Sequence, residues 1–408
     1  MKILIAIMVA IVTTAASAAP NVLVVVIDDP GYADFTGRGD DIVLPQLEGF
    51  AKRSVRCSHG YATASLCSQS RAGLLTGRTP QSMEYWNLDQ TLPSGVPILP
   101  ELTASTHRTF CIGKWHHGTT VQPLERGWQQ WYGWRAATRW YVPYGTSSHW
   151  VNQSLERNGT VIVDPPGHLT DWLADEALGA MRSTGDKPWL VWLAPLAVHA
   201  PNNKYHCHPD WYAKAPGAIN TIRRAYAAQA MHLDARLGDV VAEAERQDAL
   251  IIVTADNGGL LGVANNRPLV GGKSAHTDGG IRVPLFVRWG TRFPQRDYDQ
   301  PVSHLDLLPT ILAASDLNQP VELAGVNLTP YLTGSRGNFP PHDYLEWDRT
   351  KCIVPGPAPR TVLHSSGLKL MLADPAWLSW SDSESVQLDL SSWSEPANRL
   401  KKVTPSPP

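Results

Sequence analysis

The sequence predicts an α/β protein built on a large, mostly parallel β-sheet flanked by helices. Strand-length runs rich in Val, Ile and Leu alternate, over about 300 residues, with segments whose apolar residues recur at helical spacing. A continuous β-branched run is typical of a strand that is buried on both faces, as parallel strands are. Strands and helices that alternate in this way predict a sheet with a helical layer on each face.

Four segments have the strand pattern and two have the helical pattern. The expected strands are 21–27 (NVLVVVI), 108–114 (RTFCIGK), 188–195 (PWLVWLAP) and 249–257 (ALIIVTADN), and the expected helices are 170–183 and 225–247. Beyond about residue 335 a linker leads to one more strand, and "TVLHSSGLKLMLA" predicts a hairpin with Ser366 and Gly367 in its turn. We therefore expect a large domain over 19–335, then a small α+β subdomain with an antiparallel sheet over 336–408 that ends in a disordered tail.

Residues 1–18 have the pattern of a signal peptide. Lys2 precedes an apolar run over 3–12, and Ala16-Ser17-Ala18 forms an A-x-A cleavage site. The alternatives are a buried first strand or a membrane anchor, but the apolar run is short for a membrane span. We expect a secreted or periplasmic protein that is free of the membrane after cleavage. The net charge of −2 argues against general binding to nucleic acid.

Five cysteines make an odd number for an exported protein. If Cys67 is reactive, the other four can form two disulfides or remain buried thiols, and both options stay open. The cysteines are Cys57, Cys67, Cys111, Cys207 and Cys352.

The ends of the four predicted strands carry the polar residues of the chain that are best suited to chemistry. They read "DD", "GKWHHG", "APLAVHAP" and "TADNGG". Ligands of open α/β sheets bind beyond the carboxyl ends of the strands, so these segments are expected to form one site.

Oxygen ligands at two of these ends predict a metal site. Asp28 and Asp29 would repel each other without a cation between them, and Asp256 and Asn257 add two more oxygen donors. Oxygen-only ligation favours Ca²⁺, with Mg²⁺ as the other option. The alternative for Asp28 and Asp29 is a pair of turn residues that cap a helix.

Histidines and a lysine extend the site. His116, His117 and His199 lie at strand ends, where they suit proton transfer near neutral pH. Lys273 lies on a glycine-rich loop that can approach an anion, but Arg267 stands where a phosphate-binding loop needs glycine. "HCH" at 206–208 resembles half of a metal site, but no second cluster completes it in the sequence, so we interpret it as an ordinary loop.

Cys67 is expected at the start of a helix, with Arg71 one turn later on the same face. A helix N-terminus beside a cation favours an anion and a reactive sulfur. A cysteine-protease site would not explain the aspartates and lysines described above.

These residues together resemble the type I sulfatases of the alkaline phosphatase superfamily. "CSQSRAGLLTGR" is close to the family pattern C-x-P-S-R-x-x-x-L-T-G-R, and "GKWHHG" is close to G-K-W-H-x-G. "PNVLVVVIDDPGYAD", "ERGWQQWYG", "TADNGG", "GGKSAHTDGGIRVPLFVRW" and "SHLDLLPTIL" resemble further family segments. The resemblance covers nearly all of the chain, and it implies an alkaline-phosphatase-like sandwich whose catalytic domain is 19–335.

The resemblance implies that a formylglycine-generating enzyme oxidises Cys67 to an aldehyde, whose hydrate attacks the sulfur of a sulfate ester. Ca²⁺ would be bound by Asp28, Asp29, Asp256 and Asn257. Arg71 and Lys114 would stabilise the formylglycine oxygens, and His116 would be the base that breaks down the enzyme-bound ester. His199 and Lys273 would bind sulfate and protonate the leaving oxygen.

Three features depart from the family pattern. Gln69 stands where the maturation motif has proline, Asp278 stands where glutamate is frequent, and the C-terminal subdomain is short. Gln69 bears on maturation, and the other two bear on the fit of the substrate.

A sulfated poly- or oligosaccharide is the expected substrate, with a small aryl or alkyl sulfate as the alternative. Arginines and tryptophans alternate beyond residue 133, where aromatic rings can stack on sugars and arginines can bind sulfates. Residues expected to contact the substrate are His276, Trp134, Arg139 and Trp140, whereas Trp128 and Trp131 are expected in the core. Two other functions remain: a phosphodiesterase or phosphonate monoester hydrolase of the same superfamily, and an unmatured protein that only binds sulfated glycans.

Overall fold

The computed structural model describes residues 19–139, 141, 154–217, 220–320, 322–352, 360–367 and 369–372. The predicted signal peptide and the C-terminal tail lie outside the described residues. Among the described helices, none combines the length and the apolar character that a membrane crossing requires.

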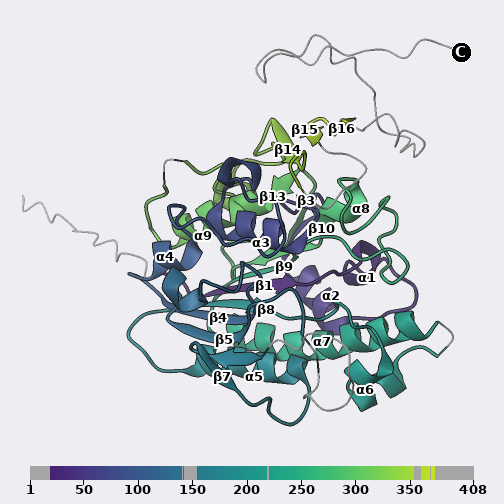
Figure 1. Cartoon of the computed structure of the whole chain (residues 1–408). Coiled ribbons are helices and arrows are strands. Elements are labelled where there is room, and N and C mark those ends of the chain that lie inside the picture. Colours follow the sequence, from purple (N-terminus) through teal and green to yellow (C-terminus); the bar gives the residue numbers. More distant parts are fainter. Residues whose placement is uncertain are drawn as a thin grey trace, which may run out of the picture.

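A ten-stranded sheet forms the centre of the molecule, which confirms the predicted α/β class (Figure 1). The four predicted strands are observed as β1 (Val22–Ile27), β4 (Arg108–Lys114), β8 (Trp189–Ala194) and β9 (Leu250–Ala255). They form the parallel centre together with β5 (Gln130–Trp134), in the order β9-β1-β8-β4-β5. Outer strands are β11 (Leu285–Arg288), β2 (Val55–Cys57) and β12 (Arg296–Tyr298) beyond β9, and β6 (Leu155–Arg157) and β7 (Thr160–Ile162) beyond β5.

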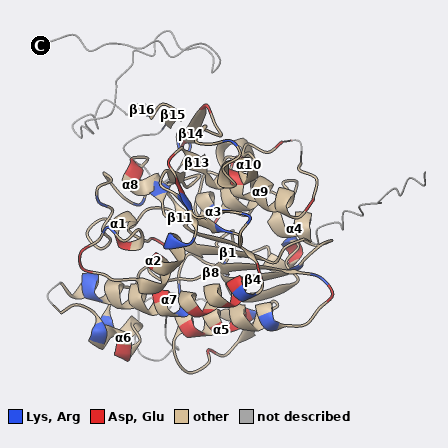
Figure 2. Cartoon of the chain, turned by 180° about the vertical axis from the view of Figure 1, so that it is seen from behind, with Lys and Arg blue, Asp and Glu red and all other residues tan. Residues whose placement is uncertain are grey.

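Helices cover both faces of this sheet, because successive side chains of the central strands point to opposite faces. Leu23 and Val25 of β1 belong to the core beneath α2 (Pro45–Lys52), α5 (Leu169–Arg182) and α7 (Thr221–Arg246). Val22 and Val24 belong to the core beneath α3 (Cys67–Thr76), α4 (Leu99–Thr103) and α9 (Leu307–Ala314). The short helix α6 (Pro209–Lys214) packs on α7, and acidic and basic residues are interspersed over the outer side of this layer (Figure 2).

Two small sheets complete the fold. One joins β10 (Arg282–Val283), β3 (Gly60–Tyr61) and β13 (Val302–Ser303), between the single-turn helices α8 (Asp278–Ile281), α1 (Tyr32–Phe35) and α10 (Thr329–Leu332) of the loops. The other is the predicted antiparallel C-terminal sheet of β14 (Tyr344–Asp348), β15 (Arg360–His364) and β16 (Lys369–Leu372), which contains the expected hairpin.

The C-terminal sheet is attached to the large domain by a shared apolar cluster. Leu345, Trp347 and Leu363 pack with Tyr61 and Ile281. The indole of Trp347 donates a hydrogen bond of 2.7 Å to the Ala62 carbonyl. The domain boundary at residue 336 stays a prediction, since this sheet packs directly on the large domain.

Close approach of the backbones keeps the central strands in place beside the site. Gly113, directly before Lys114, has φ 104°, and a Cβ there would lie 2.0 Å from the Ala194 carbonyl oxygen of β8. Only glycine fits such a position. All five cysteines lie in described segments and have free thiols, so the buried-thiol option is the one observed.

Candidate active site

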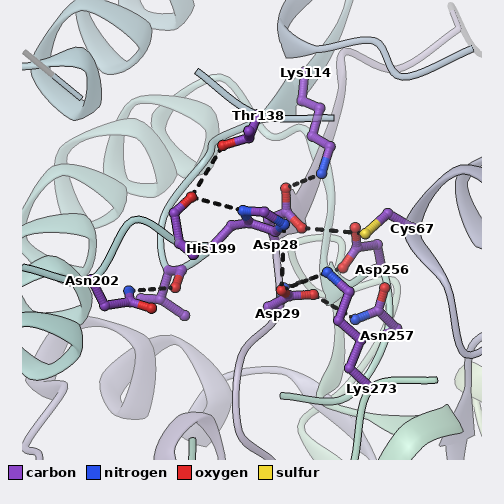
Figure 3. A network of polar contacts seen from close by, with 12 residues as sticks. Asp28, Asp29, Cys67, Lys114, Thr138, His199, Asn202, Asp256, Asn257 and Lys273 are labelled. Atoms are coloured by element: carbon purple, nitrogen blue, oxygen red, sulfur yellow. Dashed lines mark hydrogen bonds and ion pairs between the residues drawn. The ribbon is translucent and has the colours of Figure 1, made fainter. Parts of the chain in front are cut away.

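Three carboxylates meet at the carboxyl ends of β1 and β9. Ile27 and Ala255 are paired in register, so Asp28 and Asp29 emerge beside Asp256. Carboxylate oxygens of the three aspartates and Sγ of Cys67 all lie within 4.8 Å of one another, and each aspartate is at most 5% exposed (Figure 3). Asp29 has φ 58°, a conformation uncommon for a residue with a side chain, and it directs the chain out of the strand.

Three cations from other elements balance this negative charge. Arg71 of α3 donates two hydrogen bonds, of 3.0 and 2.9 Å, to Oδ2 of Asp256. The ammonium of Lys114 lies 2.5 Å from Oδ2 of Asp28, and the ammonium of Lys273 lies 2.7 Å from Oδ2 of Asp29.

Burial and charge shift the pKa values of the three aspartates in different directions. Burial and the charge of Asp256 raise the pKa of Asp28 above its usual value. Burial also acts to raise the pKa of Asp29 and of Asp256, but the neighbouring cations outweigh it and hold both below the usual range. Carboxylates at such close range remain charged together only beside positive charge.

The donor set fits a hard divalent cation. Nδ2 of Asn257 donates to Oδ1 of Asp29 at 2.7 Å, which leaves its amide oxygen directed elsewhere. Oδ1 of Asn257 is buried and has no hydrogen-bond partner among the described residues. An orphaned amide oxygen beside three carboxylates is a set of oxygen ligands that suits Ca²⁺ or Mg²⁺.

Cys67 is the first residue of α3, after Leu66 in extended conformation. Its Sγ lies 3.8 Å from Oδ1 of Asp28, and the residue is 2% exposed. Burial raises the pKa of the thiol to about 12, against the opposing effect of Lys114 and Lys273. The expectation that the helix N-terminus and Arg71 would make the unmodified sulfur reactive is therefore wrong, because burial dominates and the Arg71 guanidinium binds Asp256.

His116 reaches this network two residues beyond Lys114. It has φ 60°, and its Nε2 lies 3.3 Å from Oδ1 of Asp89. Burial and Lys114 lower the pKa of His116 to about 3. The imidazole is therefore neutral in this environment, and one of its ring nitrogens carries a lone pair.

His199 follows β8 and faces the carboxylates from the other side. Its Nε2 lies 3.6 Å from Oδ2 of Asp29, and its Nδ1 is 2.8 Å from the carbonyl oxygen of Ala200. Burial lowers the pKa of His199, and the aspartates oppose that shift. The side chains of His199 and Lys273 are each 16% exposed, so both reach toward solvent at the mouth of the site.

Three residues that hold the histidines were not found from the sequence. Asp89 contacts His116, the hydroxyl of Tyr141 donates to the His199 carbonyl at 2.7 Å, and the hydroxyl of Thr138 donates to the Ala200 carbonyl at 3.1 Å. All three lie on irregular segments, where no periodicity predicts which side chains meet.

The predicted substrate-contacting residues need correction at two positions. Trp134 is fully buried between the sheet and its helices, so its ring cannot stack on a sugar. Arg139 is 1% exposed, and its guanidinium donates to Oδ2 of Asp164 at 2.5 Å, so its charge is engaged inside the protein. Trp140 lies outside the described residues. Trp128 and Trp131 are buried in the core, as predicted.

His276 lines a small cavity on the other side of the first turn of α3. The cavity is shared with Leu66, Gln69, Trp86 and Arg349, of which the last comes from just beyond β14. Gln69 is 4% exposed, and its Nε2 donates to the Trp86 carbonyl at 2.9 Å. The residue that departs from the maturation motif is therefore a fixed part of the wall of this cavity.

Comparison with known proteins agrees with this geometry. The profile of the family described as Sulfatase matches residues 20–317. The chain belongs to the sulfatase family. It is 28% identical to the uncharacterized sulfatase YdeN of Escherichia coli, over 80% of this chain and 68% of that protein. It is 26% identical to the N-acetylgalactosamine-6-sulfatase of Canis lupus familiaris, over 83% of this chain and 70% of that protein.

Solved structures show the same sulfatase fold. Ps i-CgsB, crystallised in complex with k-i-k-neocarrahexaose, superposes with a TM-score of 0.73 at 29% identity and covers 81% of this chain and 80% of its own. The phosphonate monoester hydrolase SpPMH from Silicibacter pomeroyi superposes with a TM-score of 0.62 at 21% identity, with 87% of each chain covered. The fold alone therefore does not assign a substrate to this sulfatase.

Proposed function

We propose that this sulfatase removes sulfate from a sulfated carbohydrate, with formylglycine at position 67 and a bound Ca²⁺. The observation that carries the proposal is the network around Cys67, in which three carboxylates, three cations and two histidines from six segments converge. A protein that only binds sulfated glycans has no use for a buried neutral base such as His116, so the network favours catalysis over the unmatured binding protein.

Asp28, Asp29, Asp256 and Asn257 would bind the Ca²⁺, which supplies a Lewis acid for the sulfate oxygens. Oxidation of Cys67 would supply a hydrated aldehyde as nucleophile in place of a thiol whose pKa of about 12 keeps it protonated. Arg71 and Lys114 bring fixed positive charge to residue 67 and stabilise negative charge that develops there.

The histidines and Lys273 would handle protons and the sulfate group. His116 is the proposed base for breakdown of the enzyme-bound ester, and burial and Lys114 lower its pKa, so its imidazole is unprotonated before the reaction. Burial keeps His199 neutral before substrate binds, but a sulfate anion against it would favour the protonated form, which can donate to the leaving oxygen. Asp29 and burial act in opposite directions on Lys273, with a net pKa above its usual value, so it remains a cation for the sulfate.

Two kinds of relative support a carbohydrate substrate. The N-acetylgalactosamine-6-sulfatase of Canis lupus familiaris is named for a sulfated sugar, and Ps i-CgsB was crystallised with a ligand whose name denotes a six-unit sugar. His276, on the loop that also carries Lys273, is 2% exposed, so the carbohydrate proposal rests on these relatives and not on a sugar-binding side chain seen in the described residues. We further propose that residues 1–18 direct the protein to a secreted or periplasmic location, and that a formylglycine-generating enzyme is its maturation partner.

A comparison of ester substrates on one preparation tests this proposal. Protein with a verified formylglycine fraction is assayed with sulfated mono- and oligosaccharides, an aryl sulfate, a phosphodiester and a phosphonate monoester. We expect the highest kcat/KM with a sulfated sugar. A higher kcat/KM for the phosphodiester or the phosphonate would assign the runner-up function, and absence of turnover by fully matured protein would favour the binding protein.

A further inference from the structure

A cluster of three histidines and one aspartate lies outside the catalytic network, among α5, α6 and α7. His168 is the N-cap of α5, His208 is the N-cap of α6, His232 is on α7, and Asp171 is in the first turn of α5. The ring centroids are 4.7 Å apart for His168 and His232, 5.3 Å for His208 and His232, and 6.3 Å for His168 and His208. His168 and His232 are each 2% exposed. His208 of the "HCH" segment therefore lies beside two other histidines, His168 and His232, which are distant in the sequence.

The spacing of the rings suits one metal ion. A tetrahedral ion holds imidazole nitrogens at about 2.1 Å, which places the ring centroids of neighbouring ligands roughly 5 Å apart. The three observed centroid distances lie around that value. Ligand atoms of His168, Asp171 and His232 also lie within 4.8 Å of one another.

His232 has the hydrogen-bonding pattern of a metal ligand that lacks its metal. Its Nε2 is 2.9 Å from Oδ1 of Asp171, which as a carboxylate can only accept, so Nε2 carries the proton. The lone pair is then on Nδ1, which is buried and has no partner among the described residues. A carboxylate that fixes one ring nitrogen and leaves the other for a metal is the usual support of zinc-binding histidines.

The other two rings are held by hydrogen bonds that a metal would replace. Nδ1 of His168 accepts from the Thr170 amide at 3.2 Å while its Nε2 donates to the His206 carbonyl at 3.2 Å, and Nδ1 of His208 accepts from the Asp210 amide at 3.3 Å. The three distances are at the long end of the normal range. Helix α6, which His208 caps, has no fully buried residue, and its Trp211 stacks on His232 at 5.7 Å.

Arg236 is the cation that faces the cluster. Its Nε lies 3.5 Å from Oδ1 of Asp171, but its other nitrogens pair with Asp175 and Asp239 at 2.5 and 3.1 Å. The guanidinium is therefore balanced mainly by Asp175 and Asp239, and Asp171 keeps its hydrogen bond with Nε2 of His232.

We propose that His168, His208 and His232, with Asp171 as the carboxylate that orients His232, form a binding site for one zinc-class divalent ion, separate from the catalytic oxygen ligands. Imidazoles with a carboxylate select zinc and its neighbours cobalt, nickel and copper over calcium. We assign the ion a structural role, because Tyr141, which packs on His168, also contacts the loop that carries His199. The ring of Tyr141 stacks on His168 at 5.4 Å, and its hydroxyl donates to the His199 carbonyl at 2.7 Å. A bound ion would hold His168 in place and, through it, the Tyr141 side chain that donates to the His199 carbonyl.

Titration of Zn²⁺ into calcium-saturated protein tests the site. Excess Ca²⁺ occupies the oxygen ligands, and isothermal titration calorimetry then counts the zinc equivalents. We expect one equivalent in the wild type, and Co²⁺ in its place should give the visible absorption bands of a tetrahedral nitrogen–oxygen site. His208→Ala should weaken binding at least about 100-fold, and Asp171→Asn, which keeps the shape of the side chain, about 10- to 100-fold.

His364→Ala is the matched control, since it removes a histidine on β15 that bonds only to nearby Ser366 among the described residues. It should bind Zn²⁺ like the wild type. The proposal is overturned if calcium-saturated wild type takes up no zinc, or if His208→Ala and Asp171→Asn both bind it with unchanged affinity. The latter result would place the zinc at another site, such as the carboxylates beside Cys67.

Discussion

Gln69 is the residue at which this chain departs from the sulfatase maturation motif, and its position explains why proline can replace it. It is the third residue of α3, and the first amides of a helix have no acceptor within the helix. Proline there removes no backbone hydrogen bond that the structure records for Gln69. Loss of the Gln69 side chain would remove the hydrogen bond to the Trp86 carbonyl but leave the helix intact.

Gln69→Pro is expected to raise the fraction of formylglycine at position 67 in a heterologous host. The maturation enzyme acts on an extended segment before folding, and proline biases Ser68 toward that geometry. Mass spectrometry of the peptide that contains residue 67 measures the fraction, and activity should rise in proportion. Cys67→Ala should be inactive in both backgrounds. Full activity from a sample with only unmodified cysteine at position 67 would refute the mechanism.

Lys273 and His199 lie at the mouth of the site, where removal of the side chain should affect catalysis and not folding. Lys273→Ala and His199→Ala are each expected to lower kcat by about two to three powers of ten, the usual cost of one preorganised polar contact. Lys204→Ala removes an exposed lysine elsewhere and serves as the control. Circular dichroism should show the same fold in all three variants, and near-normal activity of either site variant would remove that residue from the proposed mechanism.

At the scale of elements, a buried carboxylate joins two helices on one face of the sheet. Oδ2 and Oδ1 of Asp234 on α7 accept hydrogen bonds from the amides of Gln46 and Leu47, at 3.1 and 2.8 Å, at the start of α2. Burial raises the pKa of Asp234 to about 6, although these amides oppose the shift. The folded state therefore binds this proton more tightly than the unfolded state does.

This link predicts a loss of stability with rising pH. The protonated Asp234 contributes its full share of the free energy of unfolding below its unfolded pKa of about 4. This contribution is lost as the pH rises to about 6, because the unfolded chain releases the proton first. Asp234→Asn removes the ionisable group and keeps an acceptor oxygen for one of the two amides. Between pH 4 and pH 7.5 the difference in the free energy of unfolding between variant and wild type should therefore shift in favour of the variant by about 1–3 kcal/mol, as measured by urea unfolding. A wild type that gains stability over the variant between pH 4 and 7.5 would contradict the assignment.

Strands and their ends could be predicted from the sequence because the signal is local. β4 is observed at its predicted bounds, and its last residue, Lys114, lies in the site as expected. Trp134 was misplaced because it ends β5, where the alternation of the strand directs it into the core, while the irregular sequence after it indicated a surface. Asp89 could not be found, because its contact with His116 depends on the path of a loop.

At the scale of the whole molecule, the site is formed where the two helical layers and the sheet meet. The carboxylates come from strand ends, Arg71 comes from a helix on one face, and Tyr141, which supports His199, packs in the core on the other face. A change in the charge of this carboxylate cluster therefore affects contacts with the sheet and with both helical layers. Lys114 and Lys273 each contact one carboxylate, so the cluster retains some charge balance of its own when no metal is bound.

Removal of calcium is accordingly expected to lower the stability of the whole protein without unfolding it. An ion that binds the folded state alone stabilises it by about 2.7 kcal/mol at a concentration of 100 times its Kd. The melting temperature of the wild type should fall by a few degrees in excess chelator and return when Ca²⁺ is restored.

Asn257→Ala removes one proposed ligand, the oxygen that has no other described partner, and should respond less to the same treatment. Because Lys114 and Lys273 already neutralise part of the cluster, the drop should be smaller than that of a protein with bare carboxylates. An equal response of wild type and Asn257→Ala would place the calcium elsewhere, and no response in the wild type would remove calcium from the site.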